Sequence, residues 1–198
     1  RKALHGRIVA ALETLYSGRL TEQVERLAHH ALRGELWDRA FAYYRQAGEK
    51  ALGRSANREA LATFEHAFVA LEHIYQTPEV IRQAIDLRLL LEMPLMQTGR
   101  LRQLLENIQE ADRLVKKIDD PLRQGRIHAF LCEAHGALGD IQLALDLGAQ
   151  AVASAERLGR AQLITLSKLL LGIHTTQCGQ YRQAVELLTA GAEAGSKL

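Results

Sequence analysis

A histidine, a cysteine and a second histidine follow one another at helical spacing in the second half of the chain. His128, Cys132 and His135 are separated by four and three residues, so on a helix their side chains share one face. Imidazole and thiolate groups suit zinc. The same face carries Ile127 and Leu131, no fourth ligand stands at a matching spacing, and a free cysteine commonly packs as a small apolar residue. We therefore expect packing here, and no metal.

The paired histidines elsewhere offer no better metal site. His29 and His30 are adjacent, so on a helix they point about 100° apart and do not face one ion. His66 and His73 lie two helical turns apart, about 10 Å along the axis, which is too far for one ion. Surface or half-buried positions are the expectation for all four.

Motifs for nucleotide chemistry are absent from the sequence. Neither GxxxxGK[ST] nor GxGxxG occurs, so no phosphate-binding loop is predicted. Titratable residues do not cluster in a pattern that assigns an acid, a base or a nucleophile. We expect no catalytic residue, no cofactor and no enzymatic activity in this chain.

The elements that carry these residues follow from a repeated pattern of small and large side chains. Steps of four, three and four place four residues on one helical stripe, and a small–large–small order lets a neighbouring helix approach closely. The stripes are Ala40–Tyr44–Ala47–Ala51, Ala60–Phe64–Ala67–Leu71, Leu104–Ile108–Ala111–Val115, Ala144–Gly148–Ala151–Ala155 and Ala184–Leu188–Gly191–Gly195.

A turn signal precedes the last three stripes at a constant distance. Gly99, Gly139 and Gly179 each stand five residues before a stripe, and glycine ends a helix well because it tolerates positive φ. An apolar residue follows each glycine two positions later, which predicts a plug at the start of the next helix. The repeat of about 40 residues predicts stacked helical hairpins.

The whole chain is predicted to be helical. Only three prolines occur, and residues that favour helices dominate. Pro94 falls inside a helical pattern and should kink or end its helix. The helix over 36–53 should pack in two successive hairpins, because successive stripes begin at Ala40 and at Ala60, half a repeat apart. The predicted helices are 3–15, 20–33, 36–53, 56–75, 78–97, 101–118, 121–137, 141–158, 160–178 and 181–195.

Three segments resemble a known repeat family. GDIQLALDLGAQAV, GQYRQAVELLTAG and WDRAFAYYRQA resemble the turn and second helix of tetratricopeptide (TPR) repeats. The resemblance implies an all-α, TPR-like superhelix, or solenoid, of about ten antiparallel helices. We expect a single TPR-like domain over 1–198. Its helices over 1–75 should be less regular, and those over 78–198 should form repeats of about 40 residues.

The N-terminal segment, 1–75, carries a second resemblance. LHGRIVAALETLY and EQVERLAHHALRGELWDRAFAYYRQAGEKALGRSANREALATFEHA resemble the region after the ATPase module in certain bacterial regulators. Those proteins combine a class III adenylate/guanylate cyclase domain, an AAA-like or STAND-type ATPase and a TPR superhelix. The resemblance implies a fragment of a larger signalling protein, whose catalytic residues would lie upstream of Arg1.

Composition limits the classes of partner. The net charge is +2 without a basic block, which argues against nucleic acid. No apolar run reaches the roughly 18 residues that a membrane span needs. Two cysteines make no disulfide framework, so a cytoplasmic location is expected.

Two predicted helices, 78–97 and 160–178, have apolar residues on two faces. In a TPR repeat the second face of the first helix lines a concave groove, so the resemblance implies partner binding there, with two charged residues selecting polar groups. The candidate groove residues are Ile85, Leu89, Met93, Met96, Arg126, Glu133, Leu166, Leu169 and Ile173. The alternative is that adjacent helices bury these side chains against each other.

The expected function is recognition of a protein, or of the ATPase and cyclase domains of the same parent. The alternative function is a small-molecule sensor of the STAND type, for which a closed pocket would be the sign. The helix over 181–195 keeps small apolar residues outside its stripe, so we also expect either a further hairpin or self-association through that helix.

Overall fold

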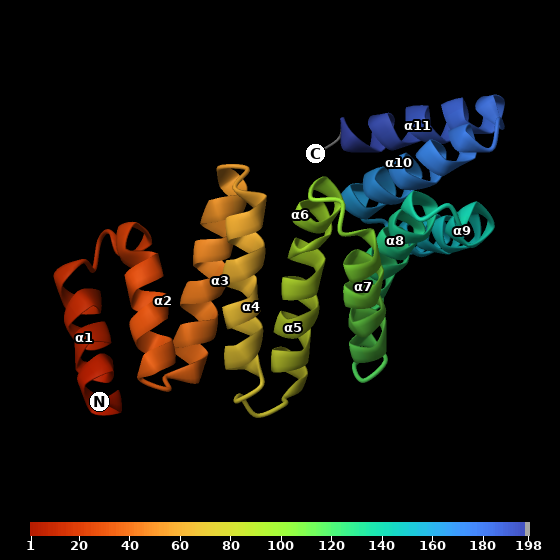
Figure 1. Ribbon diagram of the computed structural model, residues 1–198. Helices are drawn as coiled ribbons and strands as arrows, with labels where there is room; N and C mark the ends of the chain where they lie inside the picture. Colours follow the sequence, from red (N-terminus) through yellow and green to blue (C-terminus); the bar gives the residue numbers. More distant parts are fainter. Residues whose placement is uncertain (197–198) are drawn as a thin grey trace. The chain divides into compact units, whose positions relative to one another are not determined.

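The computed structural model describes residues 1–196, and every regular element in that part of the chain is helical (Figure 1). The α-helices are α1 (Lys2–Leu15), α2 (Val24–Arg33), α3 (Trp37–Gly53), α4 (Asn57–Leu71), α5 (Pro78–Leu90), α6 (Glu92–Gln97), α7 (Leu101–Val115), α8 (Pro121–Ala137), α9 (Ile141–Leu158), α10 (Ala161–Gln177) and α11 (Tyr181–Gly195). One 3-10 turn, η1 (Leu20–Gln23), precedes α2. The all-α prediction is confirmed.

The helix predicted over 78–97 is divided in two. Pro94 has no N–H to bond the carbonyl of Leu90, and its ring crowds that carbonyl. The ladder therefore breaks at Leu91, whose N–H bonds back to Arg88 at 3.2 Å, and α6 begins at the next residue. The interruption expected at Pro94 is thus confirmed.

Two other prolines start helices, as their fixed φ favours. Pro78 and Pro121 are each the first residue of a helix, where the missing N–H costs nothing. The hydroxyl of Thr77 accepts a bond from the backbone N–H of Val80 at 3.2 Å. A carboxylate oxygen of Asp120 likewise caps α8, accepting from the N–H of Arg123 at 3.0 Å.

The helices fall into two compact units, Arg1–Gly99 and Arg100–Leu198. In unit 1, α3 packs against both α2 and α4, which confirms that it is shared by two successive hairpins. In unit 2, α8 pairs with α9 and α10 pairs with α11, while α10 also packs on α8 and α9. The expectation of a single domain over 1–198 stays a prediction.

The turns of unit 2 have the predicted glycine geometry. Gly139 and Gly179 have φ of 90° and 75°, in the left-handed region. The residue after Gly139, Asp140, donates its N–H to the carbonyl of His135 at 2.9 Å, which closes a Schellman-type helix end.

Unit 1 builds the same turn without glycine. Glu35 and Ser55 have φ of 56° and 57°, and each stands two residues before the helix that follows. The next N–H again bonds back five residues, from Leu36 to Ala31 and from Ala56 to Ala51, both at 2.9 Å. Sequence reasoning missed these two positions because neither residue type favours positive φ.

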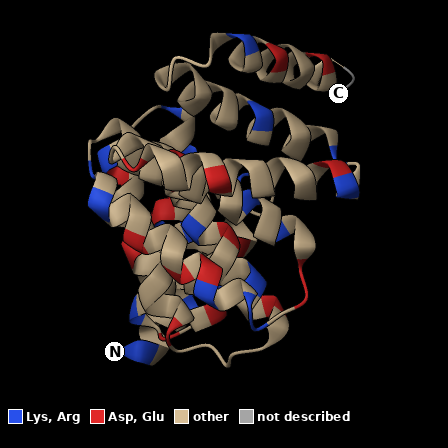
Figure 2. Ribbon diagram, turned by 90° about the vertical axis from the view of Figure 1, so that its right-hand side faces the viewer, with Lys and Arg blue, Asp and Glu red and all other residues tan. Residues whose placement is uncertain are grey.

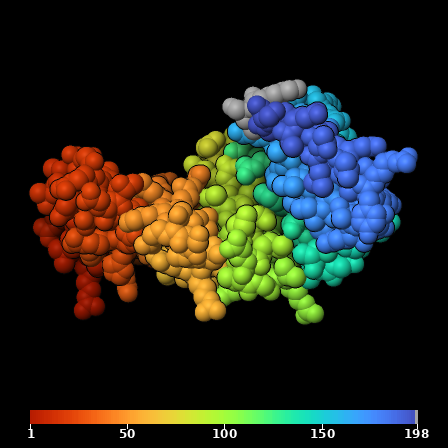
Figure 3. All heavy atoms as spheres, turned by 90° about the horizontal axis from the view of Figure 1, so that it is seen from above, coloured from red at the N-terminus to blue at the C-terminus, as the bar shows by residue number. Residues whose placement is uncertain are grey.

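The predicted stripes form the core of each unit. Every stripe residue in α7 and α9 is buried, and in α4 the ring of Phe64 is fully buried. Tyr44 is only half-buried, and its ring lies 4.9 Å from that of His66. Tyr181 is 66% exposed, so the prediction of an apolar plug is wrong at that turn. Figure 3 shows side chains filling the spaces between neighbouring helices.

Candidate functional site

The histidines and cysteine on α8 are engaged in the structure. Cys132 is fully buried, and burial raises the pKa of its thiol to about 12, so the thiol stays protonated at neutral pH. His128 lies 3.2 Å from the side-chain amide of Gln124. His135 lies 3.4 Å from the carboxylate of Asp140. Within residues 1–196, no group of three or more histidine, cysteine or acidic side chains is placed to hold a metal ion.

The candidate groove residues of unit 1 have different surroundings. Ile85 and Leu89 are buried, so they belong to the core and their assignment to an exposed groove is wrong. Helix α5 has two apolar faces, and periodicity does not tell which one its neighbours cover. Met93 of α6 is 54% exposed, and Met96 is half-buried. These two methionines are accessible to a partner, but they line none of the pockets described below.

Glu133, predicted to select polar groups of a partner, is instead held in a buried pair. Its carboxylate lies 3.3 Å from Nε2 of His174, an α10 side chain that is 2% exposed. The carboxylate raises the pKa of His174, against the opposing effect of burial. The other ring nitrogen lies 3.0 Å from the carbonyl oxygen of the Gln177 side chain. The Glu133 carboxylate lies at ion-pair distance from Nε2 without hydrogen-bond geometry, and the Gln177 oxygen lies at hydrogen-bond distance from Nδ1, so both neighbours favour the protonated ring.

The predicted apolar residues of α10 lie on its accessible face. Leu169 is 45% exposed and Ile173 is 38% exposed, while Leu166 is half-buried. Their spacing of three and four residues puts them on one stripe of the helix. Ser167, His174 and other buried residues of α10 pack into unit 2 on a different face of the helix, whereas Leu169 and Ile173 stay accessible.

A pocket of 560 Å³ adjoins this stripe between α8 and the start of α10. We name it, together with the stripe, the α8–α10 groove. The pocket is lined by Leu122, Arg126, Arg160, Gln162, Leu163 and Leu166. Two of the nine predicted groove residues, Arg126 and Leu166, therefore line one pocket. Sequence reasoning missed Arg160, whose position at the cap of α10 carries no functional signal of its own.

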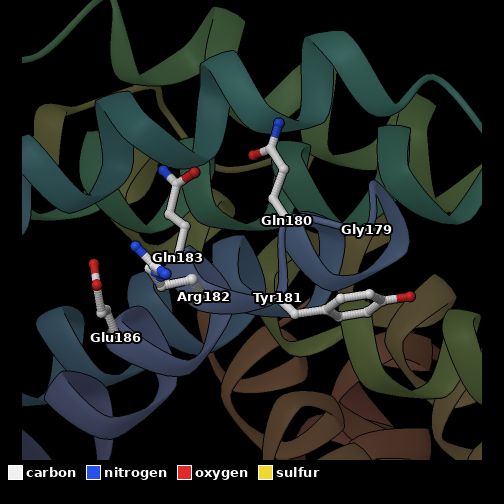
Figure 4. Close-up of a pocket in the computed structure, with 6 residues that line it drawn as sticks. All are labelled: Gly179, Gln180, Tyr181, Arg182, Gln183 and Glu186. Atoms are coloured by element: carbon white, nitrogen blue, oxygen red, sulfur yellow. The ribbon is translucent and has the colours of Figure 1, made fainter.

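Three other pockets are lined by none of the predicted groove residues. One of 430 Å³ sits at the turn into α11 (Figure 4), where Tyr181 points away from the polar side chains that line it. A second, of 470 Å³, lies between α3 and α5 in unit 1. The largest of these four pockets, of 640 Å³, lies between α1 and the start of α3.

The charges of the molecule are mixed. Figure 2 shows Lys and Arg interspersed with Asp and Glu along the helices, and α10 carries only one residue of these four types, Lys168. Such interspersed charges do not provide the basic stripe that nucleic acid usually requires. Among the described helices, none combines the length and apolar character that a membrane crossing demands.

Comparison with known proteins identifies the fold. No protein-family model matches the chain, and no curated protein matches it. BtubC (BKLC) from P. vanneervenii has a similar structure, with a TM-score of 0.69 at 15% identity over 99% of this chain and 90% of that one. A putative kinesin light chain with TPR-like repeats from Podosopora anserina gives 0.67 at 19% identity, over 99% and 93%. YrrB, a TPR protein with an unusual peptide-binding site, gives 0.56 at 18%, over 96% and 84%.

These similarities show an all-α, TPR-like repeat fold. They agree with the paired helices within each unit and with the turns that join them.

Proposed function

We propose that the chain is a non-catalytic recognition module that binds a protein segment through the α8–α10 groove. One observation carries the proposal: exposed leucine and isoleucine side chains on α10 continue directly into a pocket that holds two arginines. Exposed apolar side chains that adjoin a pocket are typical of interaction sites.

The chemistry of the groove indicates its partner. Leu166, Leu169 and Ile173 favour apolar side chains spaced along an extended or helical segment. Arg126 and Arg160 favour a carboxylate at one end of that segment. Within residues 1–196, no carboxylate lies within ion-pair distance of Arg160. The similarity to YrrB, which is described as having a peptide-binding site, supports a peptide or protein as the partner.

The parent supplies the first partner to test. The sequence resemblance of segment 1–75 implies a bacterial signalling protein with an ATPase and a nucleotide cyclase domain. We propose that the groove binds one of those domains and that this contact biases the parent between two states. A ligand or domain shifts such an equilibrium only by its difference in affinity for the two states.

Charge insertion on α10 tests the proposal. Leu169→Glu and Ile173→Glu should weaken binding of the separately produced ATPase–cyclase part by about tenfold or more, because each places a carboxylate in an apolar contact. Leu143→Glu on α9 is the matched control, since Leu143 is also an exposed apolar residue and lies outside the groove. Equal binding by all three variants, measured by calorimetry, would exclude this groove as the binding surface.

A small-molecule sensor is the second candidate function. The pocket of 640 Å³ in unit 1 has the volume of sites that take small ligands, roughly 300–1,000 Å³. Its residues all belong to unit 1, so it can be tested independently of the α8–α10 groove.

A further inference from the structure

The pocket between α1 and the start of α3 combines an aromatic wall, a small-residue floor and opposite charges. It is lined by Ala3, Gly6, Arg7, Ala10, Glu35, Leu36, Trp37, Asp38 and Arg39. Each of these three features restricts the ligand in a different way.

The aromatic wall is Trp37, the only tryptophan of the chain. The imidazole of His73 stacks on the indole with ring centroids 4.0 Å apart and planes inclined by 18°. This stacking fixes the orientation of the indole before any ligand arrives. A half-buried, fixed indole at a pocket wall offers an apolar contact and a surface on which a planar ring can pack.

The floor of the pocket is a stretch of small residues on α1. Ala3, Gly6 and Ala10 follow at steps of three and four, so they lie on one face of the helix. A Cβ atom added at Gly6 would meet no atom within 4 Å. The space in front of Gly6 is therefore open, and a side chain placed there would project into the pocket without a clash.

Two charged side chains at the pocket are available to a ligand. Arg39 bonds to Glu13 at 3.2 Å, and Lys2 bonds to Glu35 at 2.6 Å, so those charges are balanced. By contrast, the guanidinium of Arg7 has no ion-pair or hydrogen-bond partner among the side chains of residues 1–196.

The carboxylate of Asp38 likewise has no ion-pair or hydrogen-bond partner among the side chains of residues 1–196. Asp38 lies in the first turn of α3, where the helix dipole stabilises its negative charge. It also borders the neighbouring pocket between α3 and α5. The α1–α3 pocket thus presents one cation and one anion that are not neutralised by each other or by neighbours.

We propose that the α1–α3 pocket binds an aromatic zwitterion of the amino-acid class. The ring packs on Trp37 above the small residues of α1, the carboxylate pairs with Arg7, and the ammonium group pairs with Asp38. This inference rests on the second candidate function, effector binding, and does not depend on the α8–α10 groove. An aromatic acid without an amine would leave Asp38 unpaired and would meet its repulsion, and an aromatic amine would do the same at Arg7.

Three related probes test the charge pattern. L-phenylalanine carries both charges, 3-phenylpropionate lacks the amine, and 2-phenylethylamine lacks the carboxylate. Trp37 reports binding through its fluorescence, and no other residue of the chain contributes indole emission. We expect L-phenylalanine to bind roughly threefold to fivefold more tightly than either analogue, because exposed ion pairs of this kind contribute modestly. Equal affinities for the three probes, or no change in emission with any of them, would overturn the proposal.

Variants then assign each contact. Arg7→Gln should abolish the preference for L-phenylalanine over 2-phenylethylamine and leave its preference over 3-phenylpropionate. Asp38→Asn should do the reverse. Both side chains are exposed, so neither change should affect folding. Loss of both preferences in either variant, or of neither, would contradict the assigned contacts.

Filling the pocket tests its location. Gly6→Leu should abolish binding of all three probes, because the new side chain occupies the floor. Gly53→Leu is the matched control: its added Cβ also meets nothing within 4 Å, and Gly53 does not line this pocket. Gly6→Ala, a smaller change that favours the helix, should weaken binding in part. Unchanged probe binding by Gly6→Leu would place the ligand elsewhere and overturn the proposal, whatever the outcome at the α8–α10 groove.

Discussion

Each unit packs an aromatic ring against a helical glycine, and the two rings differ in chemistry. In unit 1 the phenyl ring of Phe64 lies against Gly48 of α3. In unit 2 the imidazole of His174 lies against Gly136 of α8. Both rings are buried. The phenyl ring needs only space, whereas the imidazole also needs the acceptors Glu133 and Gln177. The same close approach of helices thus supports an apolar contact in one unit and a titratable one in the other.

The largest loss of stability should come from adding one methyl group at Gly48 or at Gly136. A Cβ at Gly48 would lie well inside van der Waals contact with the Phe64 ring, and one at Gly136 would do the same with His174. Gly48→Ala and Gly136→Ala should each reduce the free energy of unfolding by about 1–3 kcal/mol through overpacking.

Chemical denaturation with circular dichroism measures both variants of the full chain. Gly53→Ala is the control, because the added methyl there meets open space and should not destabilise α3. If Gly136→Ala proves neutral while Gly48→Ala is costly, the imidazole moves aside easily and the two contacts are not equivalent.

A prediction of intermediate size concerns the pH dependence of the unfolding free energy, which the His174 ring should affect and the Phe64 ring should not. The neighbouring carboxylate raises the pKa of His174 above its unfolded value of 6.5. The stabilisation from the Glu133–His174 pair is therefore fully present below about pH 6.5 and is lost as pH rises through the folded-state pKa. His174→Gln removes this dependence.

The difference in unfolding free energy between the wild type and His174→Gln should accordingly fall as pH rises above about 6.5. Phe64→Leu provides the comparison in unit 1, and its destabilisation should not vary over that range because no titrating group is removed. A pH-independent difference for His174→Gln would mean that the pKa of the imidazole is the same in the folded and the unfolded chain, which contradicts the prediction.

The smallest effects concern the turns, in which the two units also differ. Gly139 has positive φ in unit 2, and Ser55 has positive φ at the equivalent turn of unit 1. Gly139→Ala should cost about 1–2 kcal/mol, since a Cβ is disfavoured in the left-handed region. Ser55→Gly should instead stabilise by up to about 1 kcal/mol by relieving the same strain. Thermal melts of the two variants should shift in opposite directions; shifts of the same sign would show that φ does not decide the cost.

Local rules fixed much of this molecule before any neighbour was considered. Helix spacing, the glycines before α7, α9 and α11, and the prolines at the starts of α5 and α8 each act within a few residues of themselves. For that reason the positions of the helices, most of the buried stripe residues and the break near Pro94 followed from the sequence, although the helices predicted over 56–75 and 101–118 end earlier, at Leu71 and Val115.

Tertiary packing decided the features that depend on distant residues. Ile85 and Leu89 are buried because other helices cover that face of α5, which its own two-sided pattern does not specify. Glu133 forms an ion pair with His174, a residue distant in the sequence, and this pair exists only once α8 and α10 pack together. Glu35 and Ser55 adopt positive φ without glycine, in turns that the backbone bonds from Leu36 and Ala56 close, and their residue types gave no sign of it. The periodicity of apolar residues can be read within one helix. The burial of a side chain, or its pairing with another, depends on a second helix that only the folded chain brings alongside the first.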